Sequence, residues 1–151
     1  MSAVSKQINF GIQQIKELEF FIDESVNIGE AFDFNYHVEL RNEVEHERVI
    51  FTITANYFLN KTTEAFMKGK SSTVFLIKDM KNHSRKLANG SDAVDLPDPL
   101  WITLFSIAFT HARALLAKSS SGTKYSHMLM PLINPEHEFI KIFGNHLNKG
   151  V

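Results

Sequence analysis

Seven histidines raise the question of a metal site, and several of them lie beside carboxylates. His37 and Glu39 are two residues apart, so they share one face of an expected strand, and Glu45 and His46 follow at a turn. Imidazole and carboxylate groups in this arrangement can bind Zn²⁺ or Ni²⁺ weakly. The same residues are typical of a solvated strand face of mixed charge, which is the interpretation we favour. We therefore expect no bound metal and no cofactor.

Two other groups contain the residue types of catalytic motifs without their spacing. Glu136, His137 and Glu138 are adjacent on an expected helix, where neighbouring side chains do not face one another. The run 119–124, Ser-Ser-Ser-Gly-Thr-Lys, lacks the spaced glycines of a phosphate loop and follows a helix instead of a strand. No serine lies in a nucleophile-elbow pattern. We predict no catalytic residue and a protein that is not an enzyme, with a metal-dependent enzyme as the remaining catalytic alternative.

Arg113 stands near the end of a long apolar segment and needs a partner for its guanidinium group. A carboxylate could pair with it, and backbone carbonyls of the 119–123 turn could accept its hydrogen bonds. We expect such a structural pairing, and ligand binding is the alternative.

The charge balance excludes several classes of function. Sixteen Lys and Arg residues against seventeen Asp and Glu residues give a net charge of -1, which provides no field that attracts nucleic acid or an anionic membrane. The absence of cysteine excludes disulfides, thiolate zinc sites, iron–sulfur clusters and cysteine nucleophiles. We expect no nucleic-acid partner.

A length of 151 residues fits one domain. We expect residues 1–151 to form a single domain, with disorder over about residues 1–11. The first ten residues lack the apolar core of a secretory signal. The longest apolar stretch, 100–117, contains Arg113 and several hydroxyl side chains, so it predicts a buried helix without membrane insertion. A cytoplasmic location is the resulting expectation.

The strands are predicted from alternation of apolar and polar residues. Residues 31–42 alternate strictly, and residues 49–59 do so again after a charged turn, which predicts a long antiparallel hairpin with one face on a core. The full set of predicted strands is 15–23, 31–42, 49–59 and 74–77. The segment 61–70 is ambiguous between a loop and a short helical turn around Phe66 and Met67.

Two helices are expected after the strands. Asp98 followed by Pro99 is typical of a helix N-cap and first helical position, and the predicted helix continues to about Lys118. A shorter helix is predicted to start after Asn134, with Pro135 at its first position. Together these elements predict an α+β fold, in which a four-stranded antiparallel sheet is followed by a long apolar helix and a shorter C-terminal helix.

The long helix carries more apolar surface than one contact face needs. Its polar side chains fall on one narrow stripe, formed by Thr103, Ser106, Thr110 and Arg113. Each large apolar side chain left in water forgoes about 1.5–3 kcal/mol of burial free energy, so the second face needs a cover. The C-terminal helix, another subunit or a bound ligand could supply that cover.

Three stretches of the chain resemble the SecB-like family of export chaperones, and the order of elements from about residue 12 to residue 147 is similar too. The stretches are Leu-Pro-Asp-Pro-Leu at 96–100, Arg-Ala-Leu-Leu-Ala-Lys at 113–118 with Gly-Thr at 122–123, and Met-Pro-Leu-Ile-Asn-Pro at 130–135. The chain therefore resembles a divergent SecB-like member. The resemblance implies a homotetramer, built as a dimer of dimers, with the long helix at the subunit interface.

The resemblance also implies a function in protein transport as a holdase-type chaperone or adaptor. Such a protein binds unfolded or extended apolar polypeptide segments, or a small protein partner, without ATP. The interface residues carried over are Leu104, Ile107, Ala108, His111 and Leu115. The client-binding residues carried over are Trp101, Phe105 and Phe109, with Phe75 and Ile77 on the strand opposite. The alternative is a structural interaction protein whose apolar helix serves self-assembly alone, with no client groove.

Overall fold

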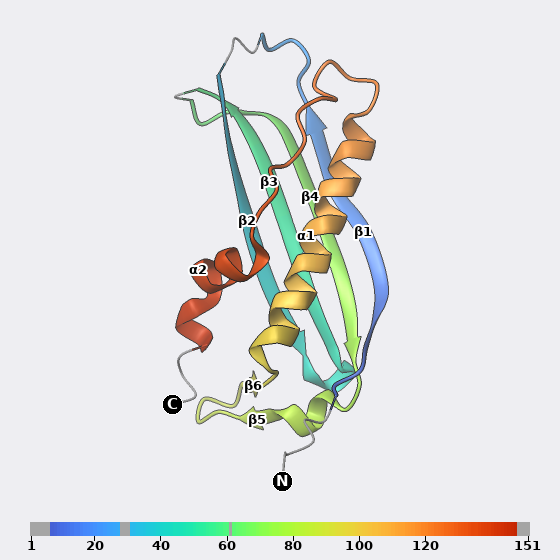
Figure 1. Cartoon of the computed structure of the whole chain (residues 1–151), viewed down its shortest axis with the longest axis vertical. Coiled ribbons are helices and arrows are strands. Elements are labelled where there is room, and N and C mark those ends of the chain that lie inside the picture. The colour runs from blue at the N-terminus through green and yellow to red at the C-terminus, as the bar shows by residue number, and fades with distance from the viewer. Residues whose placement is uncertain (1–6, 28–30, 61, 148–151) are drawn as a thin grey trace.

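The computed structural model describes residues 7–27, 31–60 and 62–147. Figure 1 shows a long helix laid across one face of a four-stranded antiparallel sheet, with a shorter helix beside one of its edges. The strands are β1 (Phe10–Ile22), β2 (Phe32–Glu43), β3 (Arg48–Leu59) and β4 (Ala65–Ile77), in the order β1-β4-β3-β2. The predicted α+β architecture is confirmed.

The β2–β3 hairpin was correctly predicted by alternation. Its register is unbroken, with Phe34 opposite Tyr57 and Val38 opposite Ile53. A short 3-10 turn over Val44–His46 connects the two strands. The apolar residues of β3 at every second position, from Val49 to Tyr57, are buried on the helix side, and Ile50 on the opposite face is buried as well.

β4 and β1 are longer than the sequence pattern indicates. Phe66 and Met67 are buried strand residues of β4, so the predicted loop or helical turn over 61–70 is wrong from Ala65 onward. β4 lies between β3 and β1. Pairing with both strands holds residues 68–72, which are polar or glycine, in the sheet. Phe10 and Gly11 belong to β1, so the disorder expected up to residue 11 does not reach them, and residues 1–6 lie outside the described part.

A small second hairpin follows β4. A 3-10 turn over Met80–His83 leads into β5 (Ser84–Lys86), which pairs with β6 (Asp92–Val94). Gly90 has φ +85° in the connecting turn, a conformation that favours glycine. This hairpin lies at the end of the sheet where the long helix begins (Figure 1).

The two α-helices are α1 (Asp98–Ser120) and α2 (Pro135–Leu147). Pro97, and not Asp98, is the N-cap of α1, because the backbone N–H groups of Leu100 and Trp101 donate to the Pro97 carbonyl. At α2 the prediction is confirmed, since Asn134 precedes the helix and its Oδ1 accepts from the His137 N–H at 3.1 Å.

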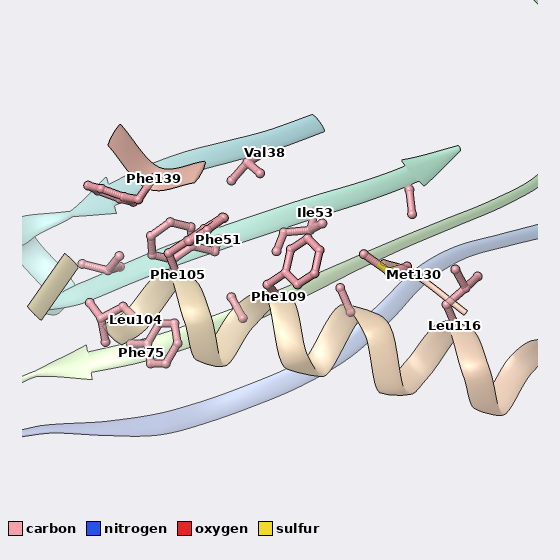
Figure 2. Close-up of a cluster of buried hydrophobic side chains, with 14 of the residues drawn as sticks. Val38, Phe51, Ile53, Phe75, Leu104, Phe105, Phe109, Leu116, Met130 and Phe139 are labelled. Carbon is pink, nitrogen blue, oxygen red and sulfur yellow. The ribbon is translucent and has the colours of Figure 1, made fainter. Parts of the chain in front are cut away.

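The core lies between α1 and the sheet, as Figure 2 shows. Phe105 of α1 packs against Phe51 of β3, with ring centroids 6.2 Å apart. Near the other end of α1, a Cβ placed on Gly69 would lie 2.7 Å from Leu116 Cδ1, so glycine permits the helix to approach β4 there. By length and composition α1 could cross a membrane, and in this structure it packs on the sheet.

Candidate polypeptide-binding groove

The five residues that the family resemblance assigned to client binding lie in the core. Trp101, Phe105, Phe109, Phe75 and Ile77 are each at most 7% exposed. The apolar face of α1 and the apolar face of the sheet bury one another, so this placement corrects the expectation of an open groove between them. Trp101 nevertheless lines a cavity on its outer side, which is described below.

The five residues assigned to a subunit interface divide into two groups. Leu104 and Ala108 are buried within the protomer, whereas Ile107, His111 and Leu115 are half-buried. The half-buried three recur at every fourth residue, so they form one stripe along α1. Thr73 Oγ1 lies 3.0 Å from His111 Nδ1, and burial lowers the pKa of His111. Of the five residues, these three are the ones that the fold leaves partly exposed.

More apolar surface is exposed on β1 than on α1. Phe10, Ile12, Ile15, Leu18 and Phe21 are each at least 36% exposed. In the described part of the chain, β1 is an edge strand with β4 as its one partner, and its register shifts between Ile12 and Gln14 and again between Glu17 and Glu19. The sequence interpretation missed this surface, because residues 10–22 mix apolar and polar side chains on both strand faces.

A groove of about 490 Å³ lies where α2, the β5–β6 hairpin and the end of β2 meet. We call it the α2 groove. Its volume falls within the range of ligand pockets, roughly 300–1,000 Å³. Its lining is Leu40, Asn42, Arg85, Leu87, Asp92, Ala93, Val94, Asp95, Trp101, Phe139 and Phe143.

Aromatic side chains from two helices form much of the apolar lining of the α2 groove. Phe139 and Phe143 are four residues apart on one face of α2, with ring centroids 5.0 Å apart. Phe139 is buried and also contacts Phe105, at 5.9 Å between centroids, which joins the groove to the core. Figure 2 shows Phe139 next to Phe105 in the buried cluster. Trp101 contributes the remaining aromatic side chain.

The position of α2 depends on a small set of contacts. Tyr36 Oη on β2 donates a hydrogen bond to Glu138 Oε2 in the first turn of α2, and burial raises the pKa of Tyr36. The linker before α2 is held by Arg113, whose Nε donates to the Met130 carbonyl at 2.7 Å. The predicted structural pairing of Arg113 is confirmed, but the acceptor lies in this linker and not in the 119–123 turn.

The charged side chains at the hairpin side of the groove pair with one another. Arg85 Nε lies 3.1 Å from Asp95 Oδ2, and Lys86 Nζ lies 3.0 Å from Asp92 Oδ1. Lys86 and Asp92 are opposite each other on β5 and β6, whereas Asp95 directly follows β6. The α2 groove therefore has an apolar interior and an electrically balanced rim.

The remaining candidates from the sequence are the His37–Glu39 pair and the 119–124 run, and both make local contacts. His37 and Glu39 are exposed, with Nε2 and Oε1 3.9 Å apart. Within 7–27, 31–60 and 62–147, no group of three or more His, Cys, Asp or Glu side chains could hold a metal ion. The 119–124 run closes the end of α1, where the Thr123 N–H and hydroxyl both donate to the Ser120 carbonyl.

Comparison with known proteins supports the fold. No model of a protein family matches the chain, and no curated protein matches it in sequence. Among solved structures it is similar to the Mycobacterium tuberculosis SecB-like chaperone Rv1957, solved in complex with a ChAD peptide from the Rv1956 HigA1 antitoxin. The TM-score is 0.50 at 8% sequence identity, over 83% of this chain and 90% of that chain. The likeness is therefore a distant one at the level of the fold.

Proposed function

We propose that the protein binds extended apolar segments of other polypeptides in the α2 groove, as a holdase-type chaperone or adaptor without catalysis or ATP. The observation that carries the proposal is the groove itself, which combines Leu40, Trp101, Phe139 and Phe143 in one accessible apolar cavity. Exposed apolar concavities rimmed by polar residues are typical of binding sites. The similar chaperone was solved with a peptide bound, which supports a polypeptide as the occupant.

Trp101 is the sole tryptophan of the chain and lines the groove, so its fluorescence reports on occupancy. We expect a short peptide of alternating leucine and serine, flanked by lysines for solubility, to shift Trp101 emission in a saturable titration. Phe143→Ala removes groove surface and should weaken binding about tenfold, which corresponds to about 1.4 kcal/mol.

The matched control is Ile142→Ala, because Ile142 is an exposed α2 residue that does not line the groove. It should bind the peptide as the wild type does. Equal weakening by both variants, or emission that the peptide does not change, would contradict the proposal. A second readout is suppression of aggregation of a chemically denatured client, which should be strong for the wild type and reduced for Phe143→Ala.

We further propose that the protein assembles as a homo-oligomer, with a dimer of dimers as the expected form. The exposed apolar side chains of β1 and the stripe of Ile107, His111 and Leu115 on α1 supply the surface. A long apolar edge strand favours pairing with another chain unless something covers it. Glu17 on β1 accepts a hydrogen bond from Ser119 Oγ at the end of the α1 stripe, so the two surfaces are continuous.

Light scattering after size exclusion tests the assembly. The double variant Ile12→Lys and Ile15→Lys places two charges on the apolar surface and should give monomers. Gln14→Lys and Lys16→Gln together form the control, because this exchange on the same strand leaves the apolar side chains intact and should preserve the oligomer. A wild-type protein that is monomeric at high concentration would refute the assembly without affecting the groove.

A further inference from the structure

The β5–β6 hairpin presents one strand edge to the α2 groove. All three residues of β6 line the groove, as does the following Asp95, whereas β5 contributes Arg85. Figure 1 shows β6 on the side of the hairpin nearer α1 and α2, with β5 on the far side. Among the described residues, β6 pairs with β5 and with no other strand. The second edge of β6 is therefore open.

The register shows which backbone groups lie at that open edge. In an antiparallel pair, residues that exchange hydrogen bonds alternate with residues whose N–H and C=O groups point away from the partner strand. Asp95 N donates to His83 O at 2.6 Å, and Leu87 N donates to Ser91 O at 2.8 Å. The intervening bonded pair is thus Arg85 with Ala93. It follows that Asp92 and Val94 direct their backbone groups away from β5.

We propose that the polypeptide segment bound in the α2 groove adds to this hairpin as a third strand, along the open edge of β6. The inference rests on the proposed function and specifies how the segment binds. Asp92 and Val94 each offer one backbone donor and one acceptor. An added strand can satisfy these groups, and alternate side chains of the segment then point toward Trp101 and Phe139.

Recognition of this kind selects for conformation more than for sequence. The charges beside the edge are paired in Arg85–Asp95 and Lys86–Asp92, so the edge does not demand a charged partner. Any extended segment can form backbone hydrogen bonds with this edge. The aromatic side chains of the groove, Trp101, Phe139 and Phe143, in addition favour an apolar side chain at every second position of the segment. The expected ligand class is therefore an extended polypeptide with alternating apolar residues, which an unfolded chain can supply.

A scan of backbone N-methylation in the leucine–serine peptide tests the inference. Each N-methyl group removes one amide donor without changing the side chains. Strand addition predicts that methylation weakens binding at every second residue, by about two- to tenfold, and has little effect at the residues between. Binding is measured by Trp101 fluorescence. If methylation has the same effect at all positions while the unmodified peptide still binds, strand addition is refuted and the proposed function stands. If the unmodified peptide does not bind, both fail.

The contribution of the backbone N–H group of Val94, at the open edge of β6, is tested with two variants. Val94→Pro removes the N–H group at the open edge, and proline is tolerated on edge strands because that group has no ladder partner. Val94→Ala removes most of the side chain and keeps the N–H group. We expect Val94→Pro to bind the peptide about two- to tenfold more weakly than Val94→Ala, with the period-two methylation pattern altered. Equal affinity of the two variants would refute the role of this edge.

Discussion

α1 and α2 differ in how they meet the rest of the fold, although each has a proline in its first turn. α1 buries seven apolar side chains along its length: Trp101, Leu104, Phe105, Ala108, Phe109, Ala112 and Leu116. In α2, Phe139 is buried, whereas Ile140 and Ile142 are exposed. A helix buried along its length stabilises the fold. A helix attached by a small set of contacts can leave an apolar groove beside it, and we place the binding function there.

The largest expected difference between the two helices concerns stability. Phe105→Ala removes a fully buried ring from the α1 side of the core and should lower the free energy of unfolding by about 3–5 kcal/mol. Phe143→Ala acts on a half-buried ring of α2 and should cost far less, because its site is already open to the groove. Urea denaturation followed by circular dichroism measures both. Equal losses would mean that α2 is as integral to the core as α1.

The close approach of α1 to β4 gives the next effect. Gly69→Val places a branched side chain where Leu116 Cδ1 lies, which should cost about 1–3 kcal/mol through overpacking. Peptide binding should be unchanged, since Gly69 is not part of the α2 groove. Thermal melting and the Trp101 titration measure the two effects separately. A loss of affinity in a folded Gly69→Val protein would show that the groove depends on the packing of α1.

The attachment of α2 to the sheet should be weaker and local. Tyr36→Phe removes the hydroxyl group that donates to Glu138 while keeping the ring that packs on Phe109. Loss of this hydrogen bond should cost about 0.5–1.5 kcal/mol and raise amide hydrogen exchange in α2 by up to about tenfold. Exchange in α1 should change little. A uniform increase over both helices would contradict a local attachment.

The smallest effect is a dependence of stability on pH that originates at α1. Burial lowers the pKa of His111 below its ordinary value of 6.5, so the folded protein binds this proton less readily than the unfolded chain. The contribution of His111 to stability is therefore complete above pH 6.5 and decreases as the pH falls below it. Denaturation at several pH values should show a shallower slope for His111→Gln than for the wild type. An identical slope would show that His111 does not sense pH.

Much of the fold follows from local pattern, and the groove does not. Strict alternation in β2 and β3 and the proline in the first turn of each helix made these elements predictable. β5 and β6 have three residues each and carry charges, so no periodicity reveals them, and the surrounding elements hold them in place. The groove combines Leu40, Trp101 and Phe139, which are distant in sequence.

The assignment of residues on α1 shows a second limit of pattern-based inference. A helix that is apolar on most sides does not reveal which apolar face meets the sheet. The resemblance placed Trp101, Phe105 and Phe109 in a groove; Phe105 and Phe109 lie in the core, and Trp101 lies between the core and the α2 groove. The exposed apolar side chains of β1 became evident when the sheet order placed that strand at an edge.

We propose that clients occupy the α2 groove and not the apolar surface of β1. Photo-crosslinking of the leucine–serine peptide, followed by mapping of the modified residues by mass spectrometry, compares the two surfaces in one experiment. We expect adducts on the β5–β6 hairpin and on Phe139 and Phe143, reduced in the Phe143→Ala variant. Adducts confined to residues 10–22, with none at the hairpin or α2, would contradict it.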